Sequence, residues 1–75
     1  MEEVVSGQLR RIYKELRYGF ISCQGKDYFF HKEDYLDDWH MLCKEHNEIT
    51  QIDLDFEPTR TDKGLRARNV RMSEG

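Results

Sequence analysis

Proline, cysteine and long apolar runs are scarce in this sequence, and each scarcity excludes a class of protein. One proline and five glycines exclude a collagen-like or low-complexity chain and fit a folded domain. No apolar run approaches the ~20 residues of a membrane span, and Met1-Glu2-Glu3 lacks the basic and apolar regions of a signal peptide. We therefore expect a cytoplasmic protein with no membrane partner. Cys23 and Cys43 are expected to be free thiols.

Charged residues make up 36% of the chain and are unevenly distributed along it. The formal net charge is -3, yet residues 8–32 hold six basic and two acidic side chains, and residues 58–72 hold five and one. Between them, residues 33–57 hold nine acidic side chains and one lysine. A chain of this length forms one small domain, residues 1–75, with its core expected over 7–72. Because two of the three segments are basic, the net charge does not exclude a nucleic-acid partner.

Two short aromatic runs are the most distinctive part of the sequence. They are Arg17-Tyr18-Gly19-Phe20-Ile21 and Tyr28-Phe29-Phe30-His31, and the stretch between them contains Gly25, which can take a positive φ at no steric cost. We predict a β-hairpin with strands Arg17–Cys23 and Asp27–His31. Side chains alternate along a strand, which assigns two faces. The outer face holds Tyr18, Phe20, Phe29 and His31, and the core face holds Ile21, Tyr28 and Phe30.

The segments on either side of this hairpin predict one strand and one helical connection. Residues 7–13 are predicted to form a strand, but Leu9, Ile12, Tyr13 and Leu16 also have the spacing of an amphipathic helix over residues 8–17. Periodicity alone does not decide between the strand and the helix. Residues 32–46 contain neither glycine nor proline, and helical spacing there predicts a short helix over the barrel end. Its apolar positions are Leu36, Trp39, Leu42 and Cys43.

The last third of the chain predicts two more strands. Residues 48–57 alternate between apolar and polar side chains, the pattern of a half-buried strand, and Pro58 is expected to end it. Residues 59–64 are expected to form a polar loop. Residues 65–72 form the last strand, whose imperfect alternation predicts a bulge or an edge position. Five short strands predict an all-β, five-stranded antiparallel barrel, with the longer connection between strands three and four.

Three motifs resemble those of the cold-shock domain family. Tyr18-Gly19-Phe20-Ile21 resembles the Phe-Gly-Phe-Ile core of the family's first ribonucleoprotein motif, and Tyr28-Phe29-Phe30-His31 is similar to the second, usually Val-Phe-Val-His. Lys63-Gly64-Leu65-Arg66-Ala67-Arg68-Asn69-Val70 resembles the closing Lys/Arg-Gly-Pro-x-Ala-x-Asn-Val. The matches come in family order and at nearly family spacing, which makes them more specific together than any one alone.

The resemblance implies a barrel of the oligonucleotide-binding (OB) type that binds single-stranded RNA or DNA, as an RNA chaperone or a regulator of gene expression. It implies neither catalysis nor a cofactor. Transferred residue by residue, the stacking residues are Tyr18, Phe20, Phe29 and His31, and the residues beside the backbone path are Arg10, Lys14 and Arg17. Arg66 and Arg68 are either ligand contacts or a charged edge that blocks strand addition.

The sequence departs from the family pattern at four places. Arg11, favoured here as a ligand contact, stands where the family has a platform tryptophan, and an arginine plane can stack on a base with less apolar area. Ile12 replaces a phenylalanine, and Lys32 stands where a further aromatic often follows the histidine. The segment 32–48 is longer than the usual connection, so the aromatic of that loop is assigned to Trp39, for which core packing is the alternative.

Other functions are weighed against this one. Arg11 in place of tryptophan, together with the acidic region 33–57, also fits a barrel that binds a basic protein. His40, Cys43 and His46 have helix-compatible spacing for a metal, with Cys23 as a fourth ligand, but structural zinc more often uses paired sets, so no metal is predicted. No glycine-rich phosphate loop or acid–base set accompanies these residues, so no enzyme is predicted. The oligomeric state is open, and a monomer is assumed.

Overall fold

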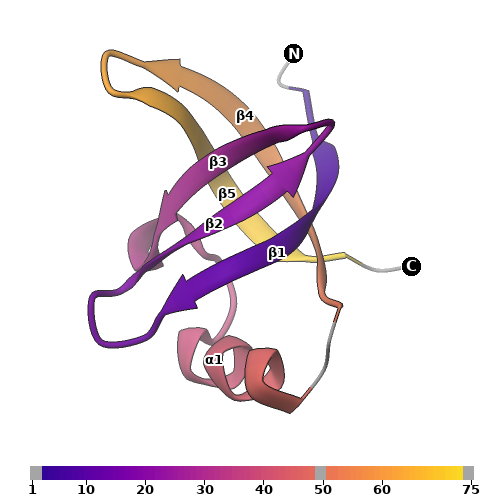
Figure 1. Cartoon of the computed structure of the whole chain (residues 1–75), viewed down its shortest axis with the longest axis vertical. Helices are drawn as coiled ribbons and strands as arrows, with labels where there is room; N and C mark the ends of the chain where they lie inside the picture. Colours follow the sequence, from indigo (N-terminus) through magenta and orange to yellow (C-terminus); the bar gives the residue numbers. More distant parts are fainter. Residues whose placement is uncertain (1–2, 49–50, 74–75) are drawn as a thin grey trace.

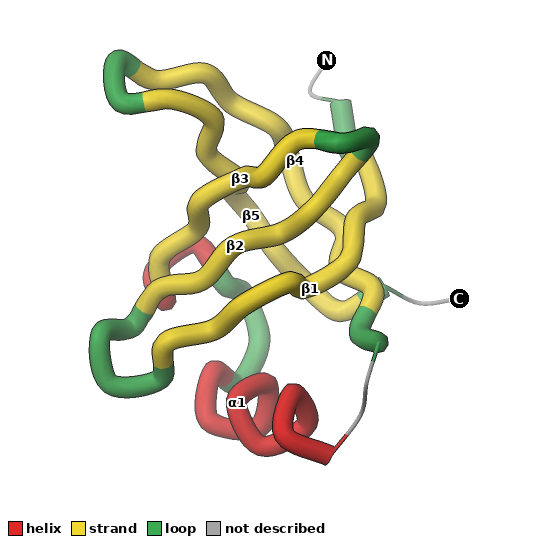
Figure 2. Tube along the Cα trace, in the orientation of Figure 1, coloured by secondary structure: helices red, strands yellow, loops and turns green. Residues whose placement is uncertain are grey.

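The chain folds as a closed β-barrel with one helix across its lower end (Figure 1). The computed structural model describes residues 3–48 and 51–73. The strands are β1 (Val5–Tyr13), β2 (Tyr18–Cys23), β3 (Lys26–His31), β4 (Asp53–Thr61) and β5 (Gly64–Met72). A short 3-10 helix, η1 (Lys32–Asp34), and the helix α1 (Trp39–Glu48) connect β3 to β4. Around the barrel the strand order is β1-β2-β3-β5-β4, and strands account for most of the trace (Figure 2).

The predicted aromatic hairpin is confirmed as β2 and β3, which pair antiparallel from Tyr18 opposite His31 to Cys23 opposite Lys26. The turn consists of Gln24 and Gly25, whose φ angles of 52° and 78° are both positive. Two successive positive φ values match the twist of the flanking strands, which makes a two-residue connection possible. The third strand therefore begins at Lys26, one residue earlier than predicted.

The first segment is a strand and not the alternative helix. β1 pairs with β4 through Val5 to Gln8 and with β2 through Gln8 to Tyr13. The β1–β2 register shifts between Leu9 and Arg11, so Arg10 is an extra residue in β1. A bulge of this kind bends its strand and re-aims the side chains that follow it.

The expectation of an entirely antiparallel barrel is wrong at one place. β3 and β5 run parallel, with Phe29 opposite Arg66. Strand directions cannot alternate at every step around a closed ring of five strands, so closure requires at least one parallel pair. Here the long connection through η1 and α1 carries the chain across the barrel end, and β4 and β5 then return as an antiparallel pair.

The predicted helix is confirmed in part of its segment, as α1 over Trp39–Glu48. Asp38 precedes it, and its Oδ1 accepts hydrogen bonds from the backbone N–H groups of His40 (3.0 Å) and Met41 (3.3 Å). Such a side-chain cap satisfies N–H groups that the first helical turn leaves unpaired. Trp39, Leu42 and Cys43 are buried, whereas Leu36 lies outside the helix and is 58% exposed.

The last two strands depart from prediction at Pro58. β4 spans Asp53–Thr61 and continues through Pro58, which lies opposite Ala67 of β5. The proline is tolerated because β4 pairs with β1 only as far as Phe56, so beyond that residue one side of the strand needs no N–H donor. Residues 49 and 50 of the predicted strand lie outside the described residues. The predicted bulge in β5 is confirmed, since the β4–β5 register shifts between Asp55 and Glu57 and Asn69 has a φ of 49°.

The barrel interior is filled by apolar side chains from all five strands and from α1. The largest fully buried ones are Phe30, Phe56, Ile21, Leu42, Leu54 and Val70. With Ile21 and Phe30 inside, the alternate residues of β2 and β3 must face outward.

Candidate nucleic-acid interface

Four aromatic side chains lie together on the outside of β1, β2 and β3, and we call them the aromatic platform: Tyr13, Tyr18, Phe20 and Phe29. Ring centroids are 4.9 Å apart for Tyr13 and Tyr18, 5.5 Å for Tyr18 and Phe29, and 6.0 Å for Phe20 and Phe29. All four side chains are only partly buried. Edge-on and tilted pairs at these distances attract one another, so the rings support each other without a covering layer.

The strand register explains why these rings share a face. Arg11 lies opposite Phe20, which lies opposite Phe29, which in turn lies opposite Arg66. A second row places Tyr13 opposite Tyr18, and Tyr18 opposite His31. Residues directly opposite one another point to the same side of a sheet. The platform is therefore a two-row surface with an arginine at each end of one row.

Three hollows border the platform. The hairpin groove, of about 410 Å³, is lined by Phe20, Phe29, Thr61, Lys63, Leu65 and Arg66. The arginine hollow, of about 310 Å³, is lined by Arg10, Arg11, Phe20 and Asp27. The turn hollow, of about 380 Å³, is lined by Tyr13, Lys14, Glu15 and Leu16. Phe20 lines both the hairpin groove and the arginine hollow.

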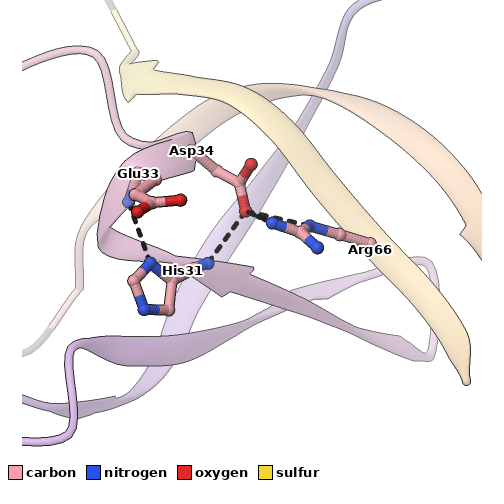
Figure 3. A network of polar contacts seen from close by, with 4 residues as sticks. All are labelled: His31, Glu33, Asp34 and Arg66. Carbon is pink, nitrogen blue, oxygen red and sulfur yellow. Dashed lines mark hydrogen bonds and ion pairs between the residues drawn. The ribbon is translucent and has the colours of Figure 1, made fainter.

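A polar network fixes the β5 side of the platform (Figure 3). The Asp34 carboxylate oxygen Oδ2 accepts from Arg66 Nε at 3.1 Å and forms an ion pair with Arg66 Nη2 at 3.0 Å. The same oxygen accepts from the backbone N–H of His31 at 2.9 Å, and His31 Nδ1 accepts from the backbone N–H of Glu33 at 3.1 Å. These bonds hold the end of β3, η1 and β5 together. The Arg66 guanidinium carbon lies 5.8 Å from the centre of the Phe29 ring.

The structure brings together most of the residues that the sequence indicated. Tyr18, Phe20 and Phe29 form the platform, and His31 lies in register beside Tyr18. Arg10, Arg11 and Arg66 line its hollows. Lys14 and Arg17 are exposed on the β1–β2 turn, where Arg17 has a φ of 63°.

Two predicted site residues lie elsewhere. Trp39 is only 7% exposed and packs in the core, with ring centroids 5.9 Å from Phe30 and 6.5 Å from Tyr35, so it is not a loop aromatic beside the platform. Trp39 is the first residue of α1, and its ring packs against Phe30 of β3 at the end of the barrel. Arg68 is exposed, but it lies opposite Glu57 of β4 and lines none of the three hollows.

Tyr13 belongs to the platform and was not among the predicted site residues. With strict alternation from the buried Leu9, Arg11 and Tyr13 would point inward. The bulge at Arg10 reverses this, and places Arg11 and Tyr13 outside. The signal in the sequence is the pair of adjacent arginines between Leu9 and Ile12, because two core residues separated by two polar ones do not fit an unbroken strand.

Neither cysteine takes part in this surface. Cys23 and Cys43 are free and buried, and burial raises the pKa of the Cys43 thiol. Within residues 3–48 and 51–73, no three His, Cys, Asp or Glu side chains are grouped so that they could hold a metal ion. None of the helices in that part of the chain is long and apolar enough to cross a membrane.

No family model matches the chain, and no curated protein matches it significantly. The platform and its hollows are therefore the basis for inferring what the protein does.

Proposed function

We propose that the protein binds single-stranded RNA or DNA by stacking bases on the aromatic platform. The observation that carries this proposal is the group of four partly exposed rings in mutual contact, 4.9 to 6.0 Å apart, on one face of the barrel. Unpaired bases expose both faces, and stacking one base on an aromatic side chain contributes ~1–3 kcal/mol with little dependence on sequence.

The charge distribution supports the same ligand. Arg10 and Arg11 on β1, and Lys14 and Arg17 on the β1–β2 turn, surround the platform with exposed cations. Most of the acidic side chains of residues 33–57 lie on η1, α1 and β4, and two lie in the connection between η1 and α1, whereas the platform rings come from β1, β2 and β3. Phosphates can therefore approach the cations without crossing the acidic surface, and binding would weaken as salt rises because counterions are released.

The fold and the motifs support an assignment to the cold-shock type of OB barrel. A closed five-stranded barrel in the order β1-β2-β3-β5-β4 is compatible with that fold. The first two family-like motifs lie on β2 and β3, and the third begins in the β4–β5 turn and continues along β5. As a noncatalytic binder, the protein would act as an RNA chaperone, because it binds only unpaired strands and so lowers the stability of weak hairpins by mass action.

The test is a fluorescence anisotropy titration of labelled oligothymidine and oligouridine at several salt concentrations. We expect salt-dependent binding by the wild type and at least tenfold weaker binding by Phe20→Ala/Phe29→Ala, which removes two stacking planes. The matched control is Leu36→Ala/Met41→Ala, which removes two exposed apolar side chains, 58% and 46% accessible, away from the platform. Wild type that binds neither oligonucleotide, or a Phe20/Phe29 double variant that binds as well as wild type, would contradict the proposal.

The alternative partner, a basic protein, has a distinct outcome in the same experiment. Its support is the set of acidic side chains on η1, α1 and β4, which includes Glu45, Glu48 and Asp53. Absence of oligonucleotide binding, together with binding of a basic polypeptide that weakens on reversing the charge of the exposed Glu48 and Asp53, would favour it.

A further inference from the structure

Arg66 differs from the other arginines around the platform because its charge is already paired. Its Nε and Nη2 both contact Asp34 Oδ2, at 3.1 and 3.0 Å, and the guanidinium lies 5.8 Å from the Phe29 ring centre. It also lines the hairpin groove. The hydrogen bond from Nε and the ion-pair contact from Nη2 to the same carboxylate oxygen restrict the orientation of the planar guanidinium group, so Arg66 presents a further planar surface next to the Phe29 ring.

The ion pair between Arg66 and Asp34 is costly to break because the Asp34 carboxylate is buried. The Asp34 side chain is 8% exposed and that of Arg66 is 29% exposed. If Arg66 turned toward a phosphate, Asp34 would stay buried without its cation, which is strongly unfavourable. The backbone N–H of His31 also binds Asp34 Oδ2 at 2.9 Å, which keeps the carboxylate in place. The pair should therefore persist when the groove is occupied.

The cations on the other side of the platform are in the opposite situation. Arg10, Arg11, Lys14 and Arg17 are exposed, and none forms an ion pair with another residue of the described ranges 3–48 and 51–73. An exposed, unpaired cation can bind a phosphate without leaving a partner behind. The β1 side of the platform is thus suited to phosphates, and the β5 side is suited to a base.

We propose that Arg66 is a base-stacking residue whose charge is offset by Asp34, so that it holds one nucleobase in the hairpin groove and does not bind phosphate. Asp34 is then a positioning residue. The inference rests on the proposed function and deepens it by assigning a direction to the ligand. The bases cover Phe20, Phe29 and Arg66, and the phosphates follow β1 and the β1–β2 turn.

The salt dependence of oligothymidine binding separates the two roles of an arginine. Each phosphate contact to a single strand contributes about 0.7 to the slope of log Kd against log salt, whereas a stacking contact contributes nothing. We expect Arg66→Ala to weaken oligothymidine binding about fivefold, because the guanidinium plane that stacks on a base is lost. The slope of log Kd against log salt should remain that of wild type. Arg10→Ala should lower the slope by about 0.7. Lys44→Ala, an exposed cation on α1, is the charge-matched control and should change neither quantity.

Asp34→Asn tests the positioning role by a quantity that a purely structural role would not change. Asparagine keeps an acceptor oxygen for the His31 N–H group but removes the charge that offsets Arg66, so the freed guanidinium can reach a phosphate. The expected slope is steeper than wild type by about 0.7. Because Arg66→Ala leaves a buried carboxylate without its cation, the double variant Asp34→Asn/Arg66→Gln is the safeguard against misfolding. It should bind more weakly than wild type with the wild-type slope.

Each outcome is decisive. If wild type binds but either Arg66 variant lowers the slope by about 0.7, Arg66 is a phosphate contact and the inference is overturned, while the proposed function stands. An Asp34→Asn slope equal to that of wild type also overturns it. If wild type binds no oligonucleotide at any salt concentration, the proposed function fails and the inference fails with it.

Discussion

Replacing Phe20 by leucine is the most informative single change in the platform. Phe20 lines both the hairpin groove and the arginine hollow. It meets the rings of Tyr18 and Phe29 nearly edge-on, at centroid distances of 5.9 and 6.0 Å. Leucine keeps an apolar side chain of similar reach in β2 but removes the flat surface. The variant therefore tests stacking with little change in burial.

The expected effects on affinity and on stability have different sizes. Loss of one stacking plane costs ~1–3 kcal/mol of binding free energy. Leucine retains some contact with a base, so we expect the dissociation constant to rise about tenfold. Loss of two ring pairs worth ~0.5–1.5 kcal/mol each lowers the free energy of unfolding by about 1–3 kcal/mol. The slope of log Kd against log salt should not change, because no charge is removed.

The assay combines an anisotropy titration with urea unfolding of the same preparation. Tyr28→Leu is the matched control, since Tyr28 neighbours Phe29 on β3 but packs inward, 5.1 Å from the Phe56 ring centre. It should lower stability and leave affinity unchanged. A folded Phe20→Leu variant that binds within about twofold of wild type, or a Tyr28→Leu variant that loses as much affinity, would refute the reasoning.

Two further predictions concern stability. A Cβ at Gly19 would lie 2.7 Å from the Arg11 carbonyl oxygen and 3.0 Å from the Phe30 ring, so Gly19→Ala must displace β1 or the Phe30 side chain. We expect the free energy of unfolding, measured in urea, to fall by about 1–3 kcal/mol. Unchanged stability would contradict this close packing. Burial, reinforced by Asp37, Glu45 and Asp38, raises the pKa of Tyr35 to about 12 from 10.0. Folding thus favours the neutral phenol, and its contribution is complete below pH 10.0 and lost as the pH rises toward about 12. Unfolding measured across that interval should show a decline of about 2–3 kcal/mol that Tyr35→Phe removes, and an equal decline in the variant would show that another group is responsible.

Local patterns in the sequence were sufficient to predict the central hairpin. The alternation of Ile21 and Phe30 with Phe20 and Phe29 separates core from surface, and Gly25 indicates the turn. The outward position of the three platform rings on β2 and β3 follows from that pattern alone. These features depend only on residues close in sequence, which is why periodicity finds them.

Periodicity could not predict the features that depend on segments far apart in the sequence. The parallel β3–β5 pair follows from closing an odd number of strands, a property of the whole ring. Pro58 is accommodated because β1 stops pairing at Phe56, which no residue near the proline reveals. Trp39 is apolar, like a stacking residue or a core residue, and only the docking of α1 makes it core. Similarly, Asp34 of η1 and Arg66 of β5 are 32 residues apart in the sequence and become neighbours only when β5 pairs with β3, so no local signal indicates their pairing.

The parallel pairing of β3 with β5 also links ligand binding to the order of folding. The β2–β3 hairpin rings can meet through local contacts, but Arg66 reaches Phe29 only after α1 and β4 have delivered β5 to its place. Contacts between distant parts of a chain form at a larger cost in loop-closure entropy, so we expect the β3–β5 pairing to form late in folding. An oligonucleotide that spans Phe29 and Arg66 would then bind only molecules in which β3 and β5 are paired. The unfolding temperature would then rise with the logarithm of the oligonucleotide concentration once that concentration exceeds Kd.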